Sequence, residues 1–324
     1  DLEFTGNATV GIAEFLRWID ITTWDEASGS AQGTLGFTQH YASLEELGNQ
    51  GVWGGMWSGT LALSPGRWRP QGNSVALEVQ GGELDLLGQD LGLRNLKIAI
   101  GQSDASVSGR IRNALNDLGM AHDLQVTSKQ LNAGQLADSE VWNGLWTGPS
   151  DPNDPEFNDP YRVELSASRV HYDDLHLSNV QSLIVGRGLN FSFQNTAADL
   201  GGGQIRGRGE WTAAQPDGGH LSTQLQFARV RLSTLLREVN NFNQTSITAS
   251  NVDGVLDATA AIQLDFDANY DWVPSSLIAE IQFNLEGGRL RDLSALQQLA
   301  RFAEVEDLKD VRFAPVRNTI YISQ

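Results

Sequence analysis

The stretch that decides the fold runs from Val252 to Phe266 and reads VDGVLDATAAIQLDF. One alternating set of residues is apolar or small and includes Ile262 and Leu264, whereas the other set includes Asp257 and Asp265. A strand points successive side chains to opposite faces, and a helix would scatter these residues around its circumference. The stretch therefore predicts a strand with one apolar face and one face in water.

The same alternation recurs along the chain, at residues 163–167, 189–193, 205–211, 225–227 and 281–285. Turn signals rich in glycine separate these segments, at residues 81–82, 201–203, 216–219 and 287–288. Short turns favour antiparallel pairing, because parallel pairing needs a crossover of about a dozen residues or more. The predicted fold class is mostly β, a long curved antiparallel sheet that forms an open groove, with a few short helices capping its edges.

Three segments have apolar residues at helical spacing. The clearest is Asp292–Phe302, with Asp292 as a helix-capping residue, and we expect this helix to cover a sheet edge or the groove mouth. Ser233–Asn241 and Gln130–Val141 are shorter candidates.

An internal repeat is also visible. DLGLRNL at 90–96 and DLHLSNV at 174–180 share the form D-L-x-L-x-N, and an apolar strand follows each. Further on, LQV at 124–126 and LQF at 225–227 each lead into a helical candidate. Repeats that cannot bury their own apolar face stack side by side.

These signals divide the chain into four parts. Residues 1–80 form a β-rich segment without assignment, residues 81–149 a first β module, and residues 161–324 a second β module. The loop at 150–160, SDPNDPEFNDP, is acidic and rich in proline, which interrupts strand pairing. The chain begins without methionine and stops within a strand pattern, so we expect it to be part of a longer protein.

Composition excludes several classes of protein. The formal net charge is −18, so a nucleic-acid partner is not expected, and anionic membrane surfaces would repel the chain. The chain has no cysteine, which excludes a disulfide scaffold. No apolar run approaches the roughly 18 residues that cross a bilayer.

Neither candidate metal site satisfies ligand geometry. The acidic loop carries the oxygen ligands that calcium prefers, but Glu156 stands where an EF-hand needs glycine and Arg162 where it needs glutamate. His171 and His176 are five residues apart, so on one strand they would point to opposite faces. We therefore expect no metal and no cofactor.

Catalytic motifs give no support for an enzyme. The chain has no G-x-S-x-G elbow, no H-E-x-x-H zinc helix and no phosphate-binding Walker loop. The prediction is a protein that is not an enzyme and has no catalytic residues. A carbohydrate-active enzyme on a β-helix scaffold stays open as a third reading.

The apolar face allows two interpretations. An uncovered face could accept acyl chains, at about 0.8 kcal/mol for each buried CH₂. A face packed against itself or a second sheet would be an ordinary core, and alternation alone does not distinguish the two.

The C-terminal region resembles a known family. From Val230 it reads VRLSTLLREVNNFNQTSITASNVDGVLDAT, and FNLEGGRLRDLSALQQLARF and LKDVRFAPVRNTIYI follow. The ordered series comprises an N-F-x-Q turn at 241–244, an N-x-x-G pair at Asn251 and Gly254, a G-x-L strand and helix at 288–302, and an F-x-x-x-x-N-x-I-x-I strand at 313–322. It resembles the C-terminal region of AsmA-like envelope proteins, relatives of TamB and of bridge-like lipid transporters.

The resemblance implies a periplasmic protein anchored to the inner membrane of a Gram-negative bacterium. Its β-groove would carry phospholipid passively between the inner and outer membranes, with acyl chains as partners and membranes reached through a segment outside this chain. The alternative is an outer-membrane assembly or structural envelope factor. The expected lipid-groove lining comprises Phe191, Phe193, Leu225, Phe227, Leu256, Ile262, Leu264, Phe266, Ile281, Phe283 and Leu285.

Overall fold

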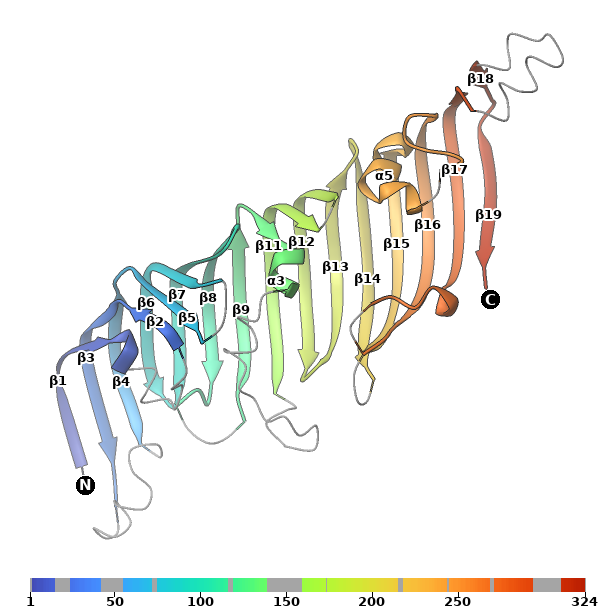
Figure 1. The fold of residues 1–324 in the computed structure, drawn as a ribbon. Coiled ribbons are helices and arrows are strands. Elements are labelled where there is room, and N and C mark those ends of the chain that lie inside the picture. Colours follow the sequence, from blue (N-terminus) through green and yellow to red (C-terminus); the bar gives the residue numbers. More distant parts are fainter. Residues whose placement is uncertain are drawn as a thin grey trace. The chain divides into compact units, whose positions relative to one another are not determined.

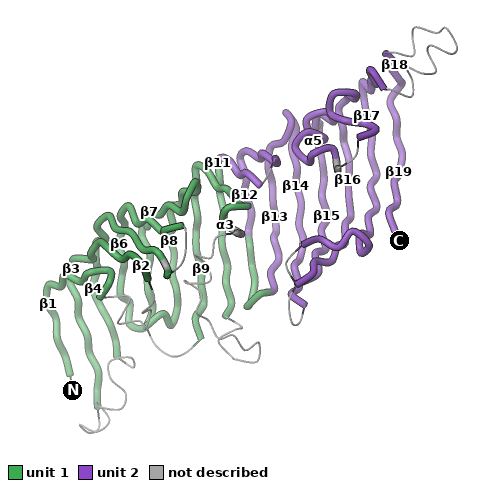
Figure 2. Tube along the Cα trace, viewed as in Figure 1, with its two compact units in different colours: residues 1–167, 184–189 green, residues 168–183, 190–324 purple. Residues whose placement is uncertain are grey.

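The computed structural model describes residues 2–14, 24–41, 55–71, 75–115, 119–138, 159–172, 174–214, 218–243, 245–268, 271–293 and 310–323. The fold is mostly β, as the alternation predicts: the described residues form nineteen strands in an open sheet and a few short helices (Figure 1). Residues 1–167 and 184–189 form unit 1, and residues 168–183 and 190–324 form unit 2 (Figure 2). Residues 1–80 and 81–149 therefore belong to the same unit.

Unit 1 contains the N-terminal strands. They are β1 (Leu2–Gly11), β2 (Trp24–Ser28), β3 (Ser30–Gln39), β4 (Met56–Leu63), β5 (Gly66–Pro70), β6 (Leu77–Gly88), β7 (Asp90–Ile100), β8 (Ser103–Arg112), β9 (Ala121–Ser128) and β10 (Leu131–Asn132), with helix α3 (Ala133–Asp138) and the first part of β11 (Pro160–Tyr172). The pairing order is β1–β3–β4–β6–β7–β8–β9–β11, and β5 joins β2 to the start of β6.

One pair of strands departs from the expected antiparallel pattern. β9 and β11 pair in parallel, from His122 opposite Tyr161 to Ser128 opposite Ala167. The glycine turns that predict hairpins are absent between these strands. Instead, residues 129–159 connect them, which is long enough for the crossover that parallel strands need.

Unit 2 contains the C-terminal strands. They are the last part of β11, β12 (Leu175–Arg187) up to residue 183, β13 (Asn190–Leu200), β14 (Gly203–Ala213), β15 (Gly219–Arg231), β16 (Val252–Phe266), β17 (Ile278–Arg291), β18 (Asp310–Arg312) and β19 (Val316–Ile322), with helix α5 (Leu232–Glu238) and the 3₁₀ turns η2 (Asn240–Asn243) and η3 (Pro274–Ser276). From β13 to β17 each strand pairs antiparallel with the next, and β19 pairs antiparallel with β17.

Strand β16 coincides with the predicted stretch Val252–Phe266. Its apolar set includes Leu264, which lies opposite Leu221 of β15, and the other set includes the exposed Asp265. Asp257 shares the side of Asp265 but is half-buried, and its carboxylate accepts a hydrogen bond of 2.9 Å from the Arg229 N–H. The exposed Asp267 follows the strand.

Two of the three predicted helices lie among the described residues. α5 falls within Ser233–Asn241 to within one residue at its start, and α3 falls within Gln130–Val141. The predicted helix Asp292–Phe302 lies outside the described residues beyond position 293.

The repeated motif D-L-x-L-x-N has a common backbone conformation. Its asparagines, Asn95 on β7 and Asn179 on β12, have φ angles of 47° and 51°. Asparagine adopts this left-handed conformation more readily than most residues. The pairing of β7 with β8 shifts register beside Asn95, which marks a β-bulge. The repeat is thus a repeat of backbone geometry as well as of sequence.

Candidate functional site

The eleven predicted lining residues all lie in unit 2, on one side of the sheet, which we call the apolar face. Register establishes this across the strands: Phe191 lies opposite Trp211, which lies opposite Leu221, which lies opposite Leu264. A second row joins Phe227 to Phe283 through Ala258. The structure therefore brings together residues from β13, β15, β16 and β17 that the sequence could only assign strand by strand.

Trp211 is a member of the apolar face that the expected lining omits. Its ring stacks on Phe191 with 6.3 Å between centroids and meets Phe266 edge-on at 5.3 Å. It also covers Gly219 on the neighbouring strand, where an added Cβ would lie 2.3 Å from the indole ring. The alternation at 205–211 was the available signal, because it already placed Trp211 in a strand; the structure adds that Trp211 lies opposite Phe191.

Burial divides the apolar face into two regions. At one end, helix α5 packs on β15 and β16, and beneath this end Val230 and Val252 are 0% and 3% exposed (Figure 1). Along the middle, Phe191, Phe227 and Leu264 are only half-buried. Side chains sandwiched between two packed layers would lose nearly all contact with water. The middle of the apolar face therefore keeps apolar surface accessible to solvent or to a ligand.

Unit 1 has an aromatic cluster on one side of its own strands. Phe37 is 1% exposed, and its ring lies 4.7 Å from Trp57 and 5.6 Å from Phe4. Leu86 and Leu115 are buried in the same cluster. The segment 1–80, which the sequence left unassigned, thus provides Phe37, the most deeply buried aromatic residue among those described in unit 1.

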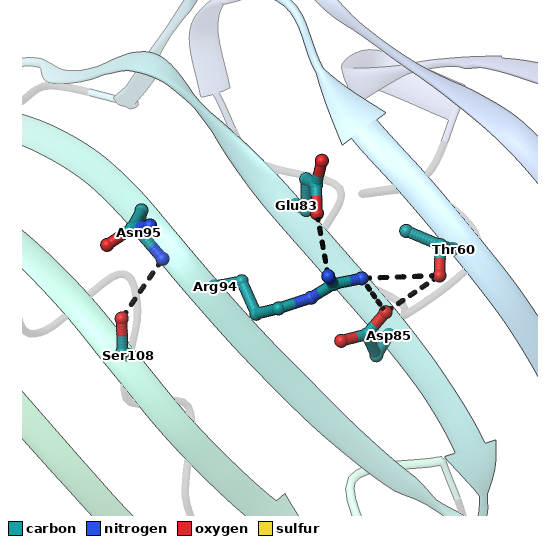
Figure 3. A network of polar contacts seen from close by, with 6 residues as sticks. All are labelled: Thr60, Glu83, Asp85, Arg94, Asn95 and Ser108. Carbon is teal, nitrogen blue, oxygen red and sulfur yellow. Dashed lines mark hydrogen bonds and ion pairs between the residues drawn. The ribbon is translucent and has the colours of Figure 1, made fainter.

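The opposite side of unit 1 carries a polar network (Figure 3). Arg94 on β7 donates to the carboxylate of Asp85 on β6 at 2.5 Å and pairs with Glu83 at 3.1 Å. Thr60 on β4 donates to the same Asp85 oxygen at 2.7 Å. The bond from Arg94, assisted by that from Thr60, lowers the pKa of Asp85 below its usual value. Because these side chains bind one another, we assign the network a structural role: it joins β4, β6 and β7.

The two histidines meet, which corrects the expectation from their spacing. His171 lies on β11 and His176 on β12, and their rings contact edge to face with 4.6 Å between centroids. The expectation of opposite faces assumed one continuous strand, whereas the chain turns back between Tyr172 and Leu175. His176 Nδ1 lies 2.8 Å from Glu238 Oε2 on α5, and this hydrogen bond raises the pKa of His176.

The described residues contain no cluster of three or more metal-ligating side chains. Most of the acidic loop at 150–160 lies outside the described residues, and only its end can be placed. There, the Asp159 carboxylate accepts a hydrogen bond of 2.7 Å from the Met120 N–H. Nor does the described part of the chain include a helix long and apolar enough to cross a membrane.

A hollow lies on the side of unit 2 opposite the apolar face, which we call the polar face. Its volume is 1090 Å³, and strands β13 to β17 all contribute to it. The sequence predicts a groove on the apolar side, whereas this concavity is lined by polar side chains such as Arg208, Gln224 and Glu280. Each side of the unit 2 sheet is therefore a separate candidate surface.

The described strands form an open β-sheet, and in unit 2 this sheet has one apolar and one polar side. No protein-family model, curated protein or solved structure matches the chain. The likeness to AsmA-like proteins consequently depends on the sequence motifs alone.

Proposed function

We propose that this protein is a passive conduit for phospholipid acyl chains in the cell envelope of a Gram-negative bacterium. The observation that carries the proposal is the row of half-buried aromatic and aliphatic residues on the apolar face, among them Phe191, Phe227 and Leu264. Residues buried by a second layer would have no surface to offer a ligand.

Burial of acyl chains supplies the affinity without catalysis. Each methylene transferred from water to the apolar face contributes about 0.8 kcal/mol, so a chain of several methylenes is held by contact alone. The backbone N–H and C=O groups of β15, β16 and β17 are paired between strands. Acyl chains on the apolar face would therefore contact side chains and not unpaired polar groups. The proposed protein therefore needs neither a cofactor nor a reacting group.

The periplasm and the inner membrane are the proposed location, on the strength of the C-terminal motifs. The net charge of −18 disfavours direct adsorption to anionic lipid surfaces. We therefore place membrane attachment in a segment outside this chain, with the apolar face as the lipid path.

A second function is favoured by strand β19, which is an edge strand among the described residues. It pairs with β17, and its side chains Ile320 and Tyr321 are 46% and 71% exposed. An exposed edge presents backbone groups that can pair with a strand of another protein. This arrangement supports an assembly or structural factor for outer-membrane proteins.

The test places a charge on each side of β16. Leu264→Asp and Phe266→Asp put a carboxylate on the apolar face, and Gln263→Asp puts one on the polar face of the same strand. We expect the first two variants to lose uptake of a fluorescent phospholipid while the third keeps it. Native mass spectrometry before and after delipidation shows which variants carry phospholipid after purification.

Thermal melting separates the lipid path from an ordinary core. On a solvent-accessible face the new carboxylate stays hydrated, and both apolar-face variants should melt close to the parent protein. In a dry core an unpaired charge costs several kcal/mol. Unfolding of both variants, or normal lipid uptake by both, would contradict the proposal.

A further inference from the structure

We infer that the hollow on the polar face of unit 2 is a binding site for a phosphate group, recognised by Arg206 and Arg208. The site does not depend on the proposed lipid path, because it lies on the opposite side of the same strands. Its floor and its walls come from different strands of one antiparallel sheet.

Side-chain length shapes the hollow. Its floor lies over β16, where Thr259 and Ala261 are short and exposed. Long side chains flank them: Gln224 on β15 and Glu280 on β17 lie in register on either side of Ala261. A second, smaller hollow of 540 Å³ shares the lining residue Thr259 and extends the concavity along the strands.

The two arginines enter this hollow together. Arg206 and Arg208 are two residues apart on β14, so both guanidinium groups project from the same side of the sheet. Arg208 donates from both Nε and a terminal nitrogen to Gln224 Oε1, at 3.1 and 2.9 Å. These bonds orient the guanidinium against β15. Arg206 makes a longer contact, 3.4 Å, with Gln204 Oε1.

Among the described residues, Arg206 and Arg208 form no ion pair with Glu210 or Glu280, the two carboxylates that also line the hollow. In the described part of the chain their partners are amide oxygens, whereas Arg94, Arg162 and Arg289 pair with carboxylates. The excess of acidic residues makes carboxylate partners abundant elsewhere in the chain. Arg206 and Arg208 thus form a local pair of positive charges with N–H donors left for a ligand.

Phosphate is the group that fits this pair. A phosphate monoester carries a charge of about −1.5 to −2 and three acceptor oxygens, which match two planar guanidinium groups. A neutral sugar would need an aromatic ring to stack on. The aromatic residue among the described lining residues is Phe193, and its ring lies on the apolar face against Gly209. The amide and hydroxyl groups of Gln226 and Ser222 would contact the rest of the ligand.

The experiment titrates inorganic phosphate into the protein at low ionic strength by calorimetry. The double variant Arg206→Gln/Arg208→Gln removes the proposed site, and Arg169→Gln/Arg312→Gln removes the same charge from exposed positions elsewhere in unit 2. We expect the first variant to lose at least tenfold in affinity and the second to bind like the parent. Because all four arginines are exposed, circular dichroism should show the same fold in each protein.

Two further titrations identify where the phosphate comes from. Glycerol 3-phosphate presents it on a soluble molecule, and vesicles of phosphatidic acid in phosphatidylcholine present it at a lipid surface, with pure phosphatidylcholine as reference. If only the Arg206/Arg208 variant loses one of these interactions, the result supports the site. The interaction that is lost then shows whether the phosphate belongs to a soluble molecule or to a lipid surface. Equal binding by all three proteins, an equal loss in both variants, or equal affinity for acetate and phosphate would overturn the inference.

Discussion

The ring of Phe193 covers Gly209 on the adjacent strand, at a position where the two residues lie directly opposite each other. A Cβ on Gly209 would lie 2.3 Å from Cζ of Phe193 and 2.7 Å from the carbonyl oxygen of Ser222. Glycine is needed here because an aromatic ring and a neighbouring backbone both approach the Cα closely.

We expect Gly209→Ala to destabilise the protein by about 1–3 kcal/mol, the usual cost of overpacking. The backbone of Ser222 cannot move aside as a flexible side chain would. Gly6→Ala is the matched control, because a Cβ on this strand glycine would meet nothing within 4 Å. Urea unfolding should separate the two variants, and equal stability would show that the Phe193 ring moves without cost.

Because the backbone at Asn95 is left-handed, the effect of a substitution there on stability should depend on whether the new residue accepts a positive φ. Asn95→Gly should leave stability nearly unchanged, whereas Asn95→Val should lower it by about 1–2 kcal/mol because valine disfavours positive φ. The backbone N–H of residue 95, which donates to Ser108 Oγ at 3.0 Å, is present in both variants (Figure 3). The same two substitutions at Asn179 should rank in the same order if the repeat is structural. Thermal melting provides the measurement.

Asp85 should make stability depend on acid pH. Its pKa is lowered in the folded state, first by the hydrogen bond from Arg94, so its contribution is present above about pH 4 and disappears as the pH falls through the lowered value. Asp85→Asn should therefore be less stable than the parent at about pH 6 and equal to it at about pH 2. Urea unfolding at the two pH values measures the difference, and an unchanged difference would exclude ionisation as the cause.

His176 should give stability the opposite dependence on pH from Asp85. Its pKa is raised above 6.5, first by the hydrogen bond to Glu238, with the Asp174 carbonyl as a further partner. The resulting stability is present below about pH 6.5 and is lost as the pH rises through the raised value. In Glu238→Gln the pKa of His176, followed by NMR, should fall back toward 6.5. Glu210→Gln, which removes an exposed charge elsewhere, should leave the titration unchanged.

Local patterns predicted the strands because a strand signal needs no distant partner. Val252–Phe266 became β16 with the expected sides, since alternation at period two is visible within one segment. The segment Ser233–Asn241 likewise indicated α5 from its own apolar spacing.

Features that depend on how segments meet could not be predicted. The spacing of His171 and His176 suggested separation, because nothing in the sequence showed that the chain reverses between them. The parallel pairing of Leu124 with Val163 could not be predicted for the same reason. A long connection allows the next strand to run parallel or antiparallel to the first. The hollow on the polar face requires the five strands β13 to β17 in their order in the sheet, which no single alternating segment reveals.

Partial exposure of the apolar face also has a calorimetric consequence. The heat capacity increment of unfolding comes mainly from apolar surface that water reaches only after the fold opens. Where Phe227, Leu264 and Phe283 already touch solvent in the folded state, less new surface appears. The increment per residue should then fall below the roughly 12–15 cal/mol/K of compact domains, which gives a flatter curve of stability against temperature. A ligand that covered this face would restore the missing increment along with the buried surface.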